Sequence, residues 1–119
     1  MELLESLSLL SKKKRILLAA SSDMLHDPDY ELVSKTDRDT LRLVEKMDYN
    51  SIKSGWSYDR QIFCGIIPVL TTIAFAQKQG CKEGQVLSYK NSGDDFPESR
   101  GEWVVGYGAA VFTLPPDQN

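Results

Sequence analysis

The sequence is poor in the residues that usually build metal centres, with one histidine and two cysteines among 119 residues. A mononuclear non-haem iron site commonly uses two histidines and a carboxylate, which this chain alone does not supply. Neither cysteine belongs to a Cys-x-x-Cys pair, so we expect no structural zinc site. Two cysteines without a signal sequence are typical of reduced thiols rather than of a disulfide.

Long apolar runs are also absent, and none approaches the ~18 residues that a membrane span needs. The first residues carry Glu2 and Glu5 where a secretion signal would carry lysines. These absences predict a cytoplasmic protein with no membrane partner. The formal net charge of -3 disfavours a nucleic-acid partner. The one basic cluster, residues 12–15, is read as a solvated turn, with a nucleic-acid or membrane patch as the alternative.

The length predicts a single domain over residues 1–119, with a flexible tail at 114–119. In the first half, leucines at helical spacing predict a helix over residues 2–10. Residues 15–20 predict a buried strand that is apolar on both faces. A loop at 27–30 follows, and Thr36 is expected to cap a helix whose inner stripe is Leu41, Val44 and Met47. A short helix near residues 48–52 should break near Gly55.

In the second half, residues 64–80 predict a buried helix, with Pro68 in its first turn and Gly80 as its stop. Residues 86–89 predict a short strand, and residues 91–98 a turn-rich loop. Residues 103–113 predict a last strand, in which Gly106 and Gly108 indicate close backbone approach or a bulge. Alternating helices and strands of this kind indicate an α/β fold with a mixed central sheet flanked by helices.

The polar end of the first predicted strand is the best candidate for a chemical centre. Asp23 and His26 are three residues apart, and carboxylate and imidazole serve as metal ligands or as acid–base groups. The alternative is that Asp23 caps a turn and His26 is a satisfied, half-buried ring. Ser21 and Ser22 lack the glycine-flanked turn of a nucleophilic serine, so no serine triad is expected.

Cys64 is the second candidate, because it opens a predicted helix, and a helix N-terminus favours the thiolate. The alternative is that Cys64 is a small, buried hydrophobic residue. We interpret Cys81 in this second way. Residues 91–94 could present oxygens and amides to a ligand, although a plain turn is the simpler interpretation. Trp56 and Tyr58 also have two interpretations: they line a pocket, or they pack in the core.

Four blocks taken together give the sequence a family resemblance. They are Ser21-Ser22-Asp23-x-x-His26, Cys64-Gly65-x-x-Pro68, Tyr89-x-Asn91-Ser92-Gly93-Asp94 and Val104-Val105-Gly106-Tyr107. In this order and spacing they resemble the Memo family, also described in prokaryotes as protein B of the AmmeMemoRadiSam system. The resemblance runs from about Leu3 to Thr113.

The resemblance implies a fold similar to that of the class III extradiol dioxygenases, with a cleft of histidines, an aspartate and a cysteine at the edge of the sheet. The match to the family motif implies that Asp23 and His26 are metal ligands. It also implies that Asp23, His26 and Cys64 are catalytic residues. The implied cofactor is a divalent metal such as iron, copper or zinc. A metal-dependent, dioxygenase-like oxidoreductase activity is implied by the family alone.

The chain is only about half as long as Memo-like proteins, whose first half supplies further histidines. The chain therefore resembles the C-terminal half of the family fold, with a partial metal or ligand cleft. An N-terminal partner chain or a homo-oligomer would complete that cleft. Two alternatives stay open: a non-catalytic module that binds a protein or peptide, and a truncated gene product that needs a partner chain.

Overall fold

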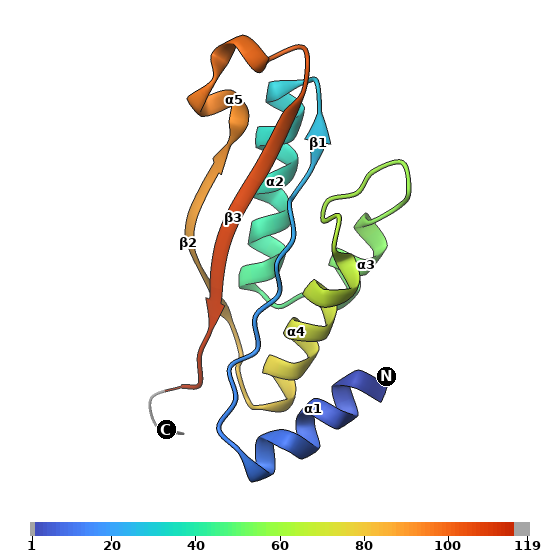
Figure 1. The fold of residues 1–119 in the computed structure, drawn as a ribbon, viewed down its shortest axis with the longest axis vertical. Helices are drawn as coiled ribbons and strands as arrows, with labels where there is room; N and C mark the ends of the chain where they lie inside the picture. Colours follow the sequence, from blue (N-terminus) through green and yellow to red (C-terminus); the bar gives the residue numbers. More distant parts are fainter. Residues whose placement is uncertain (1, 116–119) are drawn as a thin grey trace.

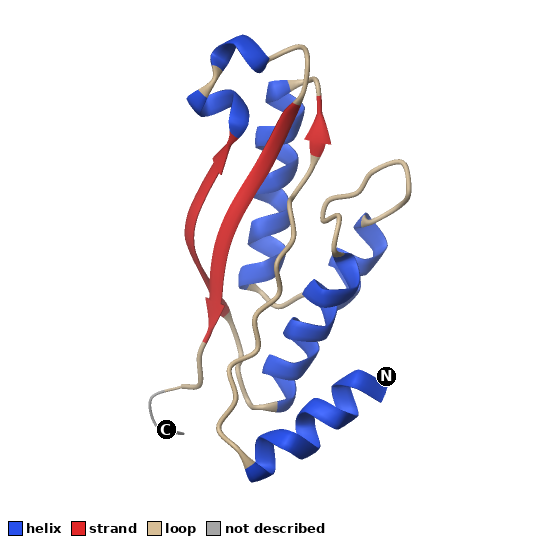
Figure 2. Ribbon diagram, viewed as in Figure 1, coloured by secondary structure: helices blue, strands red, loops and turns tan. Residues whose placement is uncertain are grey.

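The computed structural model of this chain describes residues 2–115, and these contain a three-stranded antiparallel sheet. Its strand order is β1-β3-β2. The long strands β2 (Gly84–Asn91) and β3 (Val104–Phe112) pair over most of their length, whereas β1 (His26–Asp27) pairs only with the beginning of β3 (Figures 1 and 2). The sheet and the helices together confirm the predicted α/β class.

The described part of the chain also has five α-helices, of which α2 (Tyr30–Glu45) and α5 (Ser92–Asp95) make most of the contacts with the sheet. The long helix α2 packs against all three strands, and α3 (Tyr49–Gly55) joins it to α4 (Ile66–Lys78). The first helix, α1 (Glu2–Lys13), contacts α4 and buries none of its residues (Figure 1). None of these helices within residues 2–115 has the length and apolar character to cross a bilayer.

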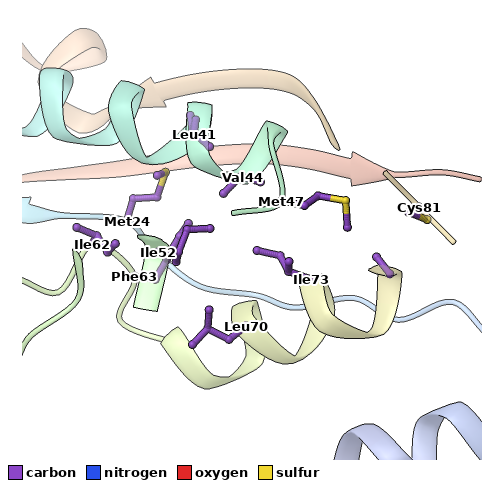
Figure 3. Close-up of a cluster of buried hydrophobic side chains, with 11 residues drawn as sticks. Met24, Leu41, Val44, Met47, Ile52, Ile62, Phe63, Leu70, Ile73 and Cys81 are labelled. Carbon is purple, nitrogen blue, oxygen red and sulfur yellow. The ribbon is translucent and has the colours of Figure 1, made fainter. Parts of the chain in front are cut away.

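The hydrophobic core lies between α2, α3, α4 and the chain that leads into β1 (Figure 3). The predicted stripe is confirmed, because Leu41, Val44 and Met47 are all buried in this cluster. A second, smaller cluster joins Leu25, Val33 and Val104. Burying each such aliphatic side chain stabilises the fold by roughly 1.5–3 kcal/mol.

Several further sequence predictions are confirmed. Pro68 lies in the first turn of α4, and Gly80 adopts a φ of 100° just beyond its end, where glycine ends a helix without strain. The short helix α3 begins after Asp48, whose carboxylate accepts a hydrogen bond from the Ser51 amide. The predicted last strand is β3. However, α4 is less covered than expected, because Ile67 is 63% exposed.

The predicted strand at residues 15–20 was wrong. This segment is a loop, no strand within residues 2–115 pairs with it, and Leu17 is 94% exposed. An apolar run specifies a strand only when a neighbouring strand accepts its hydrogen bonds and covers its faces. Here that neighbour is not among the described residues.

Two further boundaries were wrong. Helix α2 begins at Tyr30, because Asp29 and not Thr36 caps it and accepts a hydrogen bond from the Leu32 amide. The loop expected at 91–98 contains α5 (Ser92–Asp95) and a 3-10 turn, η1 (Pro97–Ser99), because Asn91 and Asp94 form a capping box. Of the predicted tail, residues 116–119 lie outside the described residues, whereas Leu114 packs against the core.

Candidate functional site

The chain that leads into β1 is anchored on two sides, and this anchoring positions Asp23 and His26. Met24 points into the larger core cluster and Leu25 into the smaller one. The Met24 amide donates to the carbonyl of Gly106, and the Gly106 amide donates to the carbonyl of Leu25. With both apolar side chains buried, Asp23 and His26 stay half-buried at the surface.

Asp23 and His26 face each other. His26 Nε2 lies 3.5 Å from Asp23 Oδ2, and this nitrogen is buried with no hydrogen-bond partner in the described part of the chain. The ring also meets Trp103 edge to face, with centroids 6.1 Å apart. A buried polar nitrogen without a partner is costly, so such an atom calls for a structural or functional explanation.

Cys64 is held next to the same segment by its backbone. The Cys64 amide donates to the carbonyl of Asp23, and the Gly65 amide donates to Ser22 Oγ at 2.8 Å. The same hydroxyl lies 3.6 Å from Cys64 Sγ. The thiol is exposed and stands just before α4, whose N-cap is Gly65. The three residues predicted as a site are therefore gathered in one region, although they are distant in sequence.

A hollow of about 390 Å³ opens beside this region. His26 and Cys64 line it, together with the exposed aromatics Tyr58 and Trp103 and the guanidinium of Arg60. Arg60 is held by a hydrogen bond from Nη2 to Thr36 Oγ1. The sequence alone did not single out Arg60 or Trp103, because nothing in their local patterns placed them near His26.

The donor set fits part of a metal site but not a whole one. Imidazole nitrogen and carboxylate oxygen each bind a divalent ion at about 2.0–2.2 Å, so a shared ion of tetrahedral geometry holds them roughly 3.4 Å apart. The observed 3.5 Å agrees with that separation. However, no group of three histidine, cysteine, aspartate or glutamate residues within 2–115 could hold a metal ion. Asp23 and His26 therefore offer two donors, fewer than a complete metal shell needs.

A buried polar cluster behind β1 was missed by the sequence interpretation. Asp37 is fully buried in α2 and accepts hydrogen bonds from the Leu25 amide and from Tyr89 Oη, the latter at 2.6 Å. Asn91 Nδ2 donates to Tyr89 Oη and to Ser34 Oγ. Burial raises the pKa of Asp37 to about 6, although the hydrogen bonds of Tyr89 and Leu25 and the nearby His26 lower it.

Asp37 could have been found from its spacing, because it precedes Leu41 by four residues and so shares the inner stripe of α2. The other candidates serve the fold. Cys81 is buried in the core, and burial raises the pKa of its thiol. Trp56 donates from Nε1 to the carbonyl of Phe63, and residues 91–94 form the cap of α5.

Fold and site together define an α/β protein with a candidate Asp–His–Cys site at one edge of its sheet. The chain belongs to the Memo-like protein family, which it matches over residues 1–111. It is 34% identical over 102 residues to a MEMO1 family protein of Methanococcus vannielii, covering 83% of this chain and 34% of that protein. A MEMO1 family protein of Saccharolobus solfataricus is 31% identical over 99 residues, with the same coverage of each chain.

The chain thus spans about a third of the length of the curated relatives it matches. No solved structure matches it.

Proposed function

We propose that this chain supplies one wall of a metal or ligand cleft, with Asp23 and His26 as two of its metal ligands. One observation carries the proposal: His26 Nε2 is buried without a hydrogen-bond partner and faces Asp23 Oδ2 at 3.5 Å. The family match supports it, because the motif that contains both residues falls inside the matched range. The remaining ligands would come from a partner chain or a second copy.

In this cleft, Asp23 and His26 would hold a divalent iron, copper or zinc ion, and Cys64 would stand at the rim as an exposed thiol. The ion would supply Lewis-acid or redox chemistry of the kind used by class III extradiol dioxygenases. The hollow beside His26, with Tyr58 and Trp103 on its wall, would receive the ligand.

Metal titration of the purified chain tests this proposal. We expect Fe²⁺, Cu²⁺ or Zn²⁺ to bind weakly in calorimetry, since two ligands are fewer than a complete shell needs. The variants His26→Ala and Asp23→Asn should each weaken binding by at least tenfold, because even an outer-shell change costs roughly that much. Asp39→Asn removes an exposed carboxylate of α2 outside the site and should leave binding unchanged.

Binding of equal strength by the parent chain, His26→Ala and Asp23→Asn would show that the metal sits elsewhere. Loss of binding in Asp39→Asn as well would point to a general effect of charge. Circular dichroism of each variant separates a lost ligand from a lost fold.

A second candidate function is binding of a protein or peptide without catalysis. The specific observation in its favour is that Tyr58 is 86% and Trp103 53% exposed on the wall of the same hollow. Exposed aromatics of this kind are enriched at binding hot spots. Peptides selected by display against the chain should bind Trp103→Ala at least roughly tenfold more weakly. Tyr107→Ala, on β3 and outside the hollow, is the matched control.

A further inference from the structure

The segment Arg15–Ser21 connects α1 with the chain that leads into β1. No backbone–backbone hydrogen bond joins it to any other residue within 2–115. Ile16 and Leu18 are half-buried, Leu17 between them is 94% exposed, and residues 19–21 are all exposed. In Figures 1 and 2 it runs as an isolated stretch between α1 and β1. The segment is therefore a loop whose backbone has no neighbouring strand among the described residues.

The segment also lies over an uncovered apolar surface. A hollow of about 560 Å³ separates it from α4 and from the second half of β3, and Ile16 and Leu18 line this hollow. The radius of gyration is 15.5 Å, whereas a compact domain of this length has about 13.5 Å. Unpaired strand edges with exposed apolar side chains pair readily with another chain.

Strand β2, at one edge of the sheet, is better protected against pairing with another chain than residues 16–21 are. Strand β2 has a register irregularity between Val86 and Ser88, and Lys90 lies on it in an ion pair with Asp95. Bulges and lysines are the usual devices that keep sheet edges from pairing. Residues 16–21 contain no charge, no proline and no glycine. Pairing is therefore favoured at residues 16–21 rather than at β2.

We propose that a second copy of this chain pairs antiparallel with the segment Arg15–Asp23, about a two-fold axis at Ala19. A two-fold dimer places the same segment of both copies opposite itself, which requires antiparallel strands. Charge selects the register, because an axis at Ala19 brings Arg15 of each copy opposite Asp23 of the other. Opposite charges on facing strand positions stabilise the pair.

The charges and exposures of the segment agree with this register. Arg15 is exposed and has no ion pair among the described residues, and the Asp23 side chain is 47% exposed. In the paired strand, residues 15, 17, 19, 21 and 23 would share one face, so Leu17 of one copy would lie opposite Ser21 of the other and lose part of its exposure. The second copy's Arg15 thereby becomes a neighbour of the Asp23–His26 pair.

Sedimentation equilibrium over roughly a hundredfold range of protein concentration tests the proposal. We expect a monomer–dimer equilibrium. Arg15→Asp and Asp23→Arg each place like charges opposite one another twice per dimer, and each should raise the dissociation constant roughly tenfold or more. The double variant restores both pairs and should regain most of the affinity. Lys13→Asp makes the same charge change in α1 and should have no such effect.

Leu17→Lys and Leu87→Lys distinguish the two sheet edges. Leu17→Lys should abolish the dimer, whereas Leu87→Lys, on β2, should leave it intact. Hydrogen exchange adds a readout of the fold: amides of residues 16–21 should be protected in the dimer and unprotected in Leu17→Lys, with β3 amides unchanged.

Three results would overturn the proposal. A strictly monomeric wild-type chain would leave the edge to another kind of partner. A dimer broken by Leu87→Lys but not by Leu17→Lys would place the interface on β2. Failure of the double charge reversal to recover affinity would rule out the register centred on Ala19.

Discussion

Replacing Gly106 by alanine is expected to destabilise the protein by roughly 3–5 kcal/mol, a large part of the stability of a domain of this size. A Cβ at Gly106 would overlap Asp37 Oδ2 and lie 2.8 Å from Asp37 Cγ. Overpacking of this kind costs about 1–3 kcal/mol. Displacing Asp37 also breaks its bonds to Tyr89 and the Leu25 amide, at about 1–3 kcal/mol for each buried group left unpaired. Urea denaturation measures the loss.

Gly55→Ala is the matched control, because a Cβ there meets only Ile62 Cδ1, at an ordinary contact distance of 3.6 Å. It should be neutral or slightly stabilising, since alanine is the better helix former. The double variant Asp37→Ala/Gly106→Ala should lose less than the sum of the two single variants, because removing the carboxylate makes room for the methyl group. Full additivity would show that Gly106 and Asp37 do not compete for space.

The elements with strong local signals were predictable from the sequence. Helix α4 is marked by Pro68 at one end and Gly80 at the other, and both residues act through their own backbone preferences. The stripe of Leu41 and Val44 follows from helical periodicity alone. Close backbone approach at Gly106 was also expected, because a glycine inside a strand leaves space that another group can fill.

The errors arose where the outcome depends on distant residues. The segment at 15–20 has the composition of a buried strand, but hydrogen bonding to a neighbouring strand decides whether it becomes one. Asp37 was missed, although it is buried with its oxygens satisfied by Tyr89 and the Leu25 amide. Neither partner can be identified from spacing along the sequence.

The candidate site was predictable as a set of residues but not as a geometry. Asp23, His26 and Cys64 were chosen by residue type and by family motif, and the fold brings them to one edge of the sheet. The contact of the His26 ring with Trp103 depends on β3, which lies about 80 residues further along the chain. Long-range pairing of this kind leaves no local pattern in the sequence.

Asp37 should also give the protein an unusual pH dependence of stability. Its carboxyl pKa is raised from 3.8 to about 6 by burial, so the folded state binds a proton more tightly than the unfolded state does. Its stabilising contribution is then fully present below about pH 4 and is lost as the pH rises through 6. Asp48 and Asp94 have lowered pKa values because Ser51 and Tyr30, respectively, donate hydrogen bonds to them, and their contributions have the opposite sign.

The variant Asp37→Asn isolates this effect, because asparagine keeps the shape of the protonated carboxyl and does not titrate. The free energy of unfolding of Asp37→Asn minus that of the wild type should rise by about 2–3 kcal/mol between pH 4 and pH 7. Asp37→Ala should instead be destabilised by about 2–4 kcal/mol, because it leaves the Leu25 amide and the Tyr89 hydroxyl buried and unpaired. Urea denaturation at each pH gives all three values.

Asp39→Asn is the control, since this carboxylate lies two residues further along α2 and is exposed beside Arg42. Its difference from the wild type should stay nearly constant across the same range of pH. A flat difference for Asp37→Asn as well would show that Asp37 ionises as freely in the folded state as in the unfolded state. In that case the Leu25 amide and Tyr89 would stabilise the carboxylate enough to offset its burial, and Asp37 would hold the backbone beside His26 as an anion.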